Sequence, residues 1–145
     1  MRIMGLDWGE KRIGVAVSDP MGWTAQGVEV INSKGSTKAD MNIIKEFAQK
    51  YNAELVVIGL PRNMDGSFGP QAEKIKALAK LLSSKIALPV ELWDERLTTI
   101  AAEKLLIQAD MSRAKRRRVI DKMAAVLILQ GYLDYLSRKK DLQDD

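Results

Sequence analysis

The first part of the chain carries the hydrophobic pattern of β-strands. Residues 3–6 form a short apolar run, and in residues 13–17 large β-branched residues alternate with small ones. The connection at residues 9–11 begins with a glycine and has the length of a hairpin turn. A third strand is expected over residues 27–31. The chain therefore begins, we predict, with an antiparallel meander of three strands.

The pattern then changes to helices and strands in turn. The continuous apolar run at residues 55–58 is typical of a parallel strand covered on both faces, and a further short strand is expected over residues 89–93. Apolar residues spaced by three and four predict amphipathic helices. Four such stripes occur, within residues 44–51, 75–82, 97–105 and 120–128.

This order of elements predicts an α/β fold. A meander followed by βαβ crossovers builds a mixed five-stranded sheet with helices on both faces. With 145 residues, the chain is long enough for one domain with a single core. We expect that domain to span residues 1–137, with residues 138–145 as a polar C-terminal tail that frays.

The composition excludes several kinds of chemistry. The chain has no Cys and no His, which removes disulfides, thiolate nucleophiles, zinc–thiolate sites and His-based triads. An enzyme of this composition depends on carboxylates, amines, hydroxyls or the backbone. Clustered carboxylates are hard oxygen ligands suited to Mg²⁺ or Mn²⁺.

The beginning of the chain gives no sign of export. An acidic residue at position 7 interrupts any signal-peptide core, and no apolar run approaches the roughly 20 residues that cross a bilayer. We therefore expect a cytoplasmic protein with no membrane partner.

Three acidic residues fall where the predicted fold would gather ligands. Asp7 closes the first strand, Glu95 follows the last strand, and Asp121 is expected in the first turn of the last helix. In open α/β sheets, ligands collect at the carboxyl ends of the strands. Carboxylates that converge there repel one another unless a cation neutralises them, and a two-metal site of this kind hydrolyses phosphodiesters without a His base. The small residues at 124–125 would let the last helix approach the sheet closely.

Each acid also has a simpler interpretation. Asp7 precedes a Trp-Gly pair and has the composition of a turn residue. Glu95 and Asp121 have the placement of acids that interact favourably with a helix N-terminus. Asp121 has potential ion-pair partners in Lys122 and Arg118. These alternatives stay open unless the three carboxylates meet.

Basic residues surround the same predicted edge. Residues 113–118 carry five basic side chains in six positions, and the net charge of +4 permits a polyanionic partner. Such a run is most often a solvated loop, but here it lies next to the candidate metal site. We predict that the basic and polar residues of this rim contact nucleic-acid phosphates: Lys11, Arg12, Arg62, Asn63, Arg96, Lys115, Arg116 and Arg117.

Four sequence blocks resemble the YqgF (RuvX) family of the ribonuclease H-like superfamily. They are GLDWGEKRIGVAVSD, VVIGLPRNMDGS, DERLTT and VIDKMAAVLILQGYL, in the order expected for the family and over nearly the whole chain. The resemblance implies a ribonuclease H-like fold and a divalent-metal nuclease. It assigns the roles of catalytic acids and metal ligands to Asp7, Glu95 and Asp121, with Mg²⁺ or Mn²⁺ as the cofactor.

The family is described in two ways, which imply different substrates. One description is a Holliday-junction resolvase similar to RuvC, and the other is a nuclease that processes the 5′ end of pre-16S rRNA during ribosome biogenesis. RuvC-type resolvases carry a second acid one turn along the last helix, where this chain has Ala124. We therefore favour pre-rRNA, with the ribosome or its precursors as a partner and structured DNA as the alternative. Asp94 is a further acid at this site, but strand alternation points it away from Glu95.

Two other classes of protein compete with a nuclease. The Asp7-x-Gly9 hairpin also resembles the first phosphate loop of the actin–hexokinase–Hsp70 superfamily, although one lobe without a second such hairpin argues against an ATP-binding module. A non-catalytic nucleic-acid-binding protein would use the same basic rim.

Overall fold

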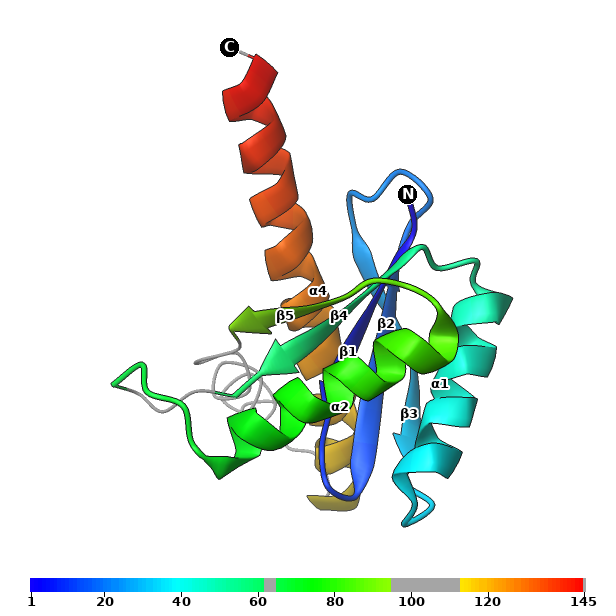
Figure 1. Cartoon of the computed structure of the whole chain (residues 1–145). Helices are drawn as coiled ribbons and strands as arrows, with labels where there is room; N and C mark the ends of the chain where they lie inside the picture. Colours follow the sequence, from blue (N-terminus) through cyan, green and yellow to red (C-terminus); the bar gives the residue numbers. More distant parts are fainter. Residues whose placement is uncertain (62–64, 95–112, 145) are drawn as a thin grey trace.

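The protein is an α/β sandwich of three layers. The computed structural model describes residues 1–61, 65–94 and 113–144, and for residues 113–119 and 142–144 it describes the backbone only. One mixed sheet forms the middle layer, with helices on both faces (Figure 1). The strands, in the spatial order β3-β2-β1-β4-β5, are β3 (Ala25–Asn32), β2 (Arg12–Ser18), β1 (Ile3–Trp8), β4 (Leu55–Leu60) and β5 (Val90–Asp94).

The connections between the strands are those that the sequence predicts. The first three strands pair antiparallel, with Asp7 opposite Gly14 in the first hairpin. β4 then pairs parallel with β1, and β5 parallel with β4. Every residue of β4 is buried, as expected for a central parallel strand with helices on both sides. The prediction of a meander followed by βαβ crossovers is confirmed.

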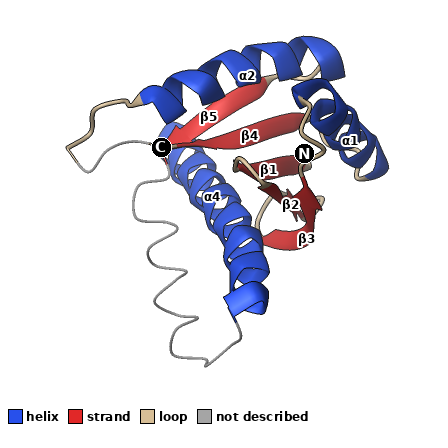
Figure 2. Cartoon of the chain, turned by 90° about the horizontal axis from the view of Figure 1, so that it is seen from below, coloured by secondary structure: helices blue, strands red, loops and turns tan. Residues whose placement is uncertain are grey.

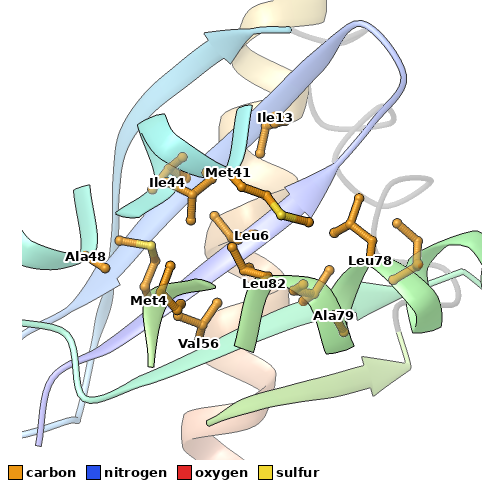
Figure 3. Close-up of a cluster of buried hydrophobic side chains, with 14 of the residues drawn as sticks. Met4, Leu6, Ile13, Met41, Ile44, Ala48, Val56, Leu78, Ala79 and Leu82 are labelled. Atoms are coloured by element: carbon orange, nitrogen blue, oxygen red, sulfur yellow. The ribbon is translucent and has the colours of Figure 1, made fainter. Parts of the chain in front are cut away.

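Two helices cover one face of the sheet. α1 (Thr37–Lys50) begins after Ser36, whose side chain accepts a hydrogen bond from the Ala39 amide. α2 (Pro70–Ile86) has Pro70 at its first position, where the missing N–H is not needed. Their apolar stripes close the larger core against alternate residues of the central strands (Figure 3). Buried side chains of this core include Met4, Leu6, Ile13, Ile44, Val56 and Leu82.

A single long helix, α4 (Arg113–Asp144), covers the opposite face (Figure 2). Its buried residues pack on the other set of alternating strand residues, among them Ile3, Ala16 and Val57. The helix crosses the sheet from β2 and β3 towards β5. None of the helices in the described residues is both long and apolar enough to cross a membrane.

Several element boundaries differ from the predictions. β1 extends two residues further than expected, so that Asp7 lies within the strand rather than after it. α4 already includes Arg113, because a run rich in Arg, Lys and Ala favours helix even without an apolar stripe. The prediction that Asp121 occupies the first turn of the last helix is therefore wrong. The helix predicted over residues 97–105 lies outside the described residues.

The C-terminal residues also continue α4, which runs to Asp144. This stretch contains no Gly or Pro to stop a helix, and its Lys, Leu and Gln residues are good helix formers. The division into a domain over residues 1–137 and a polar tail remains a prediction.

Candidate functional site

Asp7 faces helix α4. Alternate residues of a strand point to opposite faces, and in β1 Met4 and Leu6 belong to the core under α1 and α2. Ile3 belongs to the core under α4, and a Cβ at Gly5 would lie 2.7 Å from Leu129 of that helix. Asp7 continues this second series. Its carboxylate therefore lies between the carboxyl end of β1 and the helix that carries Asp121.

A glycine lets α4 sit directly on the hairpin at this point. A Cβ at Gly14 would lie 2.1 Å from the carbonyl oxygen of Asp121 and 3.4 Å from the Cβ of Ala125. Only a residue without a side chain allows the two backbones to come so close. Because Gly14 is the cross-strand partner of Asp7, the same contact places Asp121 next to Asp7. The close helix approach expected from the small residues at 124–125 is confirmed.

The surroundings of Asp7 disfavour its charged form. Burial, and secondarily the negative charge of Asp121, raises the pKa of Asp7 from 3.8 to about 6. Asp121 itself accepts a hydrogen bond from Nε of Arg12, at 2.5 Å from its Oδ2. The site thus has two acids and one paired cation, and Asp7 is the acid whose ionisation is disfavoured.

The third predicted ligand, Glu95, follows the last strand of the sheet. The strands β1, β4 and β5 run parallel, so their carboxyl ends lie at one edge of the sheet, and β5 ends at Asp94. Glu95, which follows, lies outside the described residues. Within the described part of the chain, no three acidic side chains form a group able to hold a metal ion.

Asp94 lies on the other face from Asp7. Leu92 packs against the core under α1 and α2, whereas Trp93 packs against the core under α4. Asp94, the next residue, therefore points to the α1 and α2 side. The Asp94 carboxylate is separated by the sheet from Asp7 and Asp121.

The predicted nucleic-acid contacts are only partly described. Lys11 is an exposed residue of the hairpin, and Arg12 begins β2 and pairs with Asp121. Arg62, Asn63 and Arg96 lie outside the described residues. Three further residues lie on the first turns of α4, where the backbone alone is described: Lys115, Arg116 and Arg117.

Two features of the site were missed from the sequence. One is the role of Gly14 as the seat of α4, which the alternation of small residues with β-branched ones in β2 could have indicated. The other is the pairing of Arg12 with Asp121, 109 positions later in the chain. No sequence signal reveals that pair, because it depends on how α4 is rotated over the hairpin.

Comparisons with known proteins agree on the family. The sequence model of the family RuvX, described as "Holliday junction resolvase", matches residues 1–135. A protein of Pelotomaculum thermopropionicum named "Putative pre-16S rRNA nuclease" is 62% identical over 140 residues, covering 97% of this chain and 91% of its own. A protein of Listeria innocua with the same name is 60% identical, covering 92% of this chain and 98% of its own.

Solved structures agree on the fold. Thermus thermophilus RuvC, in complex with a Holliday junction substrate, superposes with a TM-score of 0.57 at 15% identity, covering 92% of this chain and 94% of its own. The fowlpox virus Holliday junction resolvase gives a TM-score of 0.57 at 17% identity, covering 94% and 99% of the two chains. The predicted ribonuclease H-like fold is confirmed. The match over residues 1–135, together with these closely similar relatives, shows that the chain belongs to the RuvX family.

Proposed function

We propose that this protein is a divalent-metal-dependent nuclease that processes the 5′ end of pre-16S rRNA in the cytoplasm. The observation that carries the proposal is the juxtaposition of Asp7 and Asp121 at the carboxyl end of β1. Gly14, the cross-strand partner of Asp7, lets the backbone of α4 approach at Asp121. The proposed substrate follows the name that these relatives bear. Pre-ribosomal particles would then be the partner.

The chemistry of the donor set fits Mg²⁺ or Mn²⁺. Asp7 and Asp121 offer hard carboxylate oxygens, and the chain has no His or Cys to favour a softer metal. The raised pKa of Asp7 means that its ionised form lacks a compensating positive charge, which a divalent cation would provide. In our proposal Asp7, Asp121 and Glu95 hold the cation. A bound cation would supply water activation and charge neutralisation at the scissile phosphate.

Other residues of the chain would position the nucleic acid. Lys11 and Arg12 lie on the hairpin beside the two carboxylates, where their charges can contact phosphates on either side of the bond to be cleaved. The same role is proposed for the remaining residues of the predicted basic rim: Arg62, Asn63, Arg96, Lys115, Arg116 and Arg117. This role predicts affinity that falls steeply with salt.

The test is a cleavage assay with Mg²⁺ or Mn²⁺ on an RNA that spans the 5′ end of pre-16S rRNA. We expect Asp7→Asn and Asp121→Asn each to lose at least about 100-fold in cleavage rate, because each removes a ligand charge from the reacting centre. Asp141→Asn is the matched control, since it removes an exposed acid from the same helix α4. No cleavage by the wild type, or equal cleavage by Asp7→Asn, would overturn the proposal.

A Holliday-junction resolvase is the second candidate. It is favoured by the description of the family model. Against it, the residue one turn along α4 from Asp121 is Ala124, which is fully buried and carries no carboxylate. Adding a four-way DNA junction to the assay discriminates the two, because a resolvase would cleave the junction in preference to the RNA.

A further inference from the structure

Arg12 is held by a proposed metal ligand rather than free to meet a substrate. It is the first residue of β2, and its side chain belongs to the same sheet face as Gly14, towards α4. Its Nε donates to Oδ2 of Asp121, and the two side chains remain 28% and 20% exposed. A pair between two ionised groups is among the stronger hydrogen bonds in proteins.

A guanidinium and a metal ion compete for this carboxylate. Each neutralises the negative charge of Asp121, and each needs its oxygen lone pairs. A divalent cation held by Asp121 would compete with Arg12 for the carboxylate and would repel its positive charge. Because the side chain of Arg12 is partly exposed, it has a path outwards to solvent.

We propose that Arg12 is an internal counter-cation that occupies Asp121 in the metal-free protein and is released to a nucleic-acid phosphate when a divalent cation binds. This inference rests on the proposed function and adds a positioning role for one residue. The release makes metal binding and substrate binding cooperative. By linkage, each ligand then increases the affinity for the other by the same factor.

The neighbouring residue Lys11 provides a matched control. It carries the same charge one position earlier in the hairpin, but it is exposed and makes no ion pair among the described residues. Lys11→Gln therefore removes one positive charge near the site but leaves the Arg12–Asp121 pair in place. Any effect of Arg12→Gln beyond that of Lys11→Gln reports the pair itself.

The first experiment measures Mn²⁺ binding by calorimetry in the absence of nucleic acid. We expect Arg12→Gln to bind Mn²⁺ about tenfold more tightly than the wild type, because a charge-assisted hydrogen bond no longer competes. Lys11→Gln should change the affinity about twofold at most, because exposed charges are well screened. Arg12→Lys keeps the charge without the guanidinium geometry and should fall between the wild type and Arg12→Gln.

The outcomes separate this proposal from the proposed function. If the wild type and Arg12→Gln bind Mn²⁺ equally, Arg12 does not compete with the metal, and the nuclease proposal stands. If neither binds and both are folded by circular dichroism, the metal site itself is wrong. Binding by Arg12→Gln alone supports the competition. Should Arg12→Gln fail to fold, an affinity of Arg12→Lys equal to that of the wild type would overturn the proposal.

A second measurement tests the release to phosphate. The probe is a phosphorothioate RNA oligonucleotide, which resists hydrolysis, and its affinity is measured by fluorescence anisotropy with Mn²⁺ and with a chelator. We expect Mn²⁺ to tighten oligonucleotide binding several-fold more in the wild type than in Arg12→Gln. Equal tightening in both proteins would show that Arg12 does not move to the phosphates.

Discussion

At the scale of single residues, the ionised form of Asp7 lowers the stability of the folded protein. Its carboxylate lies beneath α4 and next to Asp121, where the ionised form is poorly solvated, and this raises the pKa of Asp7 to about 6. The positive charge of Arg12 compensates the negative charge of Asp121 but not that of Asp7. Asp7 is therefore the residue at which a change should most clearly separate stability from activity.

Replacing Asp7 with Asn should stabilise the metal-free protein at neutral pH. The pKa of Asp7 is higher in the folded protein than its ordinary value of 3.8, so the folded state binds the proton more tightly than the unfolded state. The stability that this group contributes is present below about pH 4 and is lost as the pH rises through about 6. In chelator at pH 7–8, Asp7→Asn should gain up to about 3 kcal/mol in free energy of unfolding. Urea denaturation from pH 4 to pH 8 measures this difference.

The pH dependence of that gain is the informative part. The difference between Asp7→Asn and the wild type should grow between about pH 4 and pH 6 and then level off, because in this range the folded wild type keeps a proton that its unfolded state has already lost. A difference that stays constant from pH 4 to pH 8 would contradict the raised pKa. Asp141→Asn, which removes an exposed acid, should show little change at any pH.

At the scale of elements, the extent and rotation of α4 determine the site. The stripe expected at Ile120, Met123, Ala124, Leu127 and Ile128 is rotated in the structure, where Met123 and Leu127 are only half-buried. Ala125 and Leu129 face the sheet instead, against Gly5 and Gly14. An apolar helix with residues of similar hydrophobicity on adjacent faces does not reveal its own rotation. The rotation of the helix is determined instead by glycines of the sheet, because these positions allow the helix backbone to approach most closely.

Gly14→Ala should therefore displace α4. The added Cβ would lie 2.1 Å from the carbonyl oxygen of Asp121, a backbone atom that cannot move without the helix. We expect a loss of several kcal/mol in free energy of unfolding, more than the ~1–3 kcal/mol of ordinary overpacking. Denaturation in urea measures the loss.

Gly27→Ala is the matched control for this experiment. Gly27 also faces α4, but its Cβ would meet only the flexible side chain of Lys122, at 2.6 Å from Cγ. That side chain can turn away, so the loss should be small. If Gly14→Ala were no less stable than Gly27→Ala, the close approach of the α4 backbone to β2 would be disproved.

At the scale of the whole molecule, the fold followed from the sequence and part of the site did not. The alternation at residues 13–17 and the apolar run at residues 55–58 specify a meander and a central parallel strand, because the period of a strand reports which faces are buried. The meeting of Asp7 with Asp121 was expected, but on the premise that the last helix begins over the edge of the sheet, whereas Asp121 lies well inside α4. The partner of Arg12 was not, because side-chain pairing between distant elements depends on packing details that periodicity does not carry.

The C-terminal limit of the folded unit is indicated by where burial ends along α4. Among the α4 side chains that the structure describes, the last buried ones are Tyr132 and Leu133, which pack on the sheet, and Tyr132 donates a hydrogen bond to Glu91 of β5. Residues 137–141 are all exposed. A chain that stops after Ser137 should therefore keep its free energy of unfolding within about 0.5 kcal/mol of the wild type, since exposed residues contribute little.

A shorter chain gives the contrast. Stopping after Gln130 removes both Tyr132 and Leu133 from the core under α4, and losses of about 2–5 kcal/mol for each large buried side chain should leave the protein unfolded or nearly so. Circular dichroism during thermal unfolding compares the two truncations with the full chain. The chain that stops after Ser137 should also bind Mn²⁺ as the full chain does, because Asp7 and Asp121 keep their packing. A large loss of stability on removal of residues 138–145 would mean that the end of α4 belongs to the folded domain.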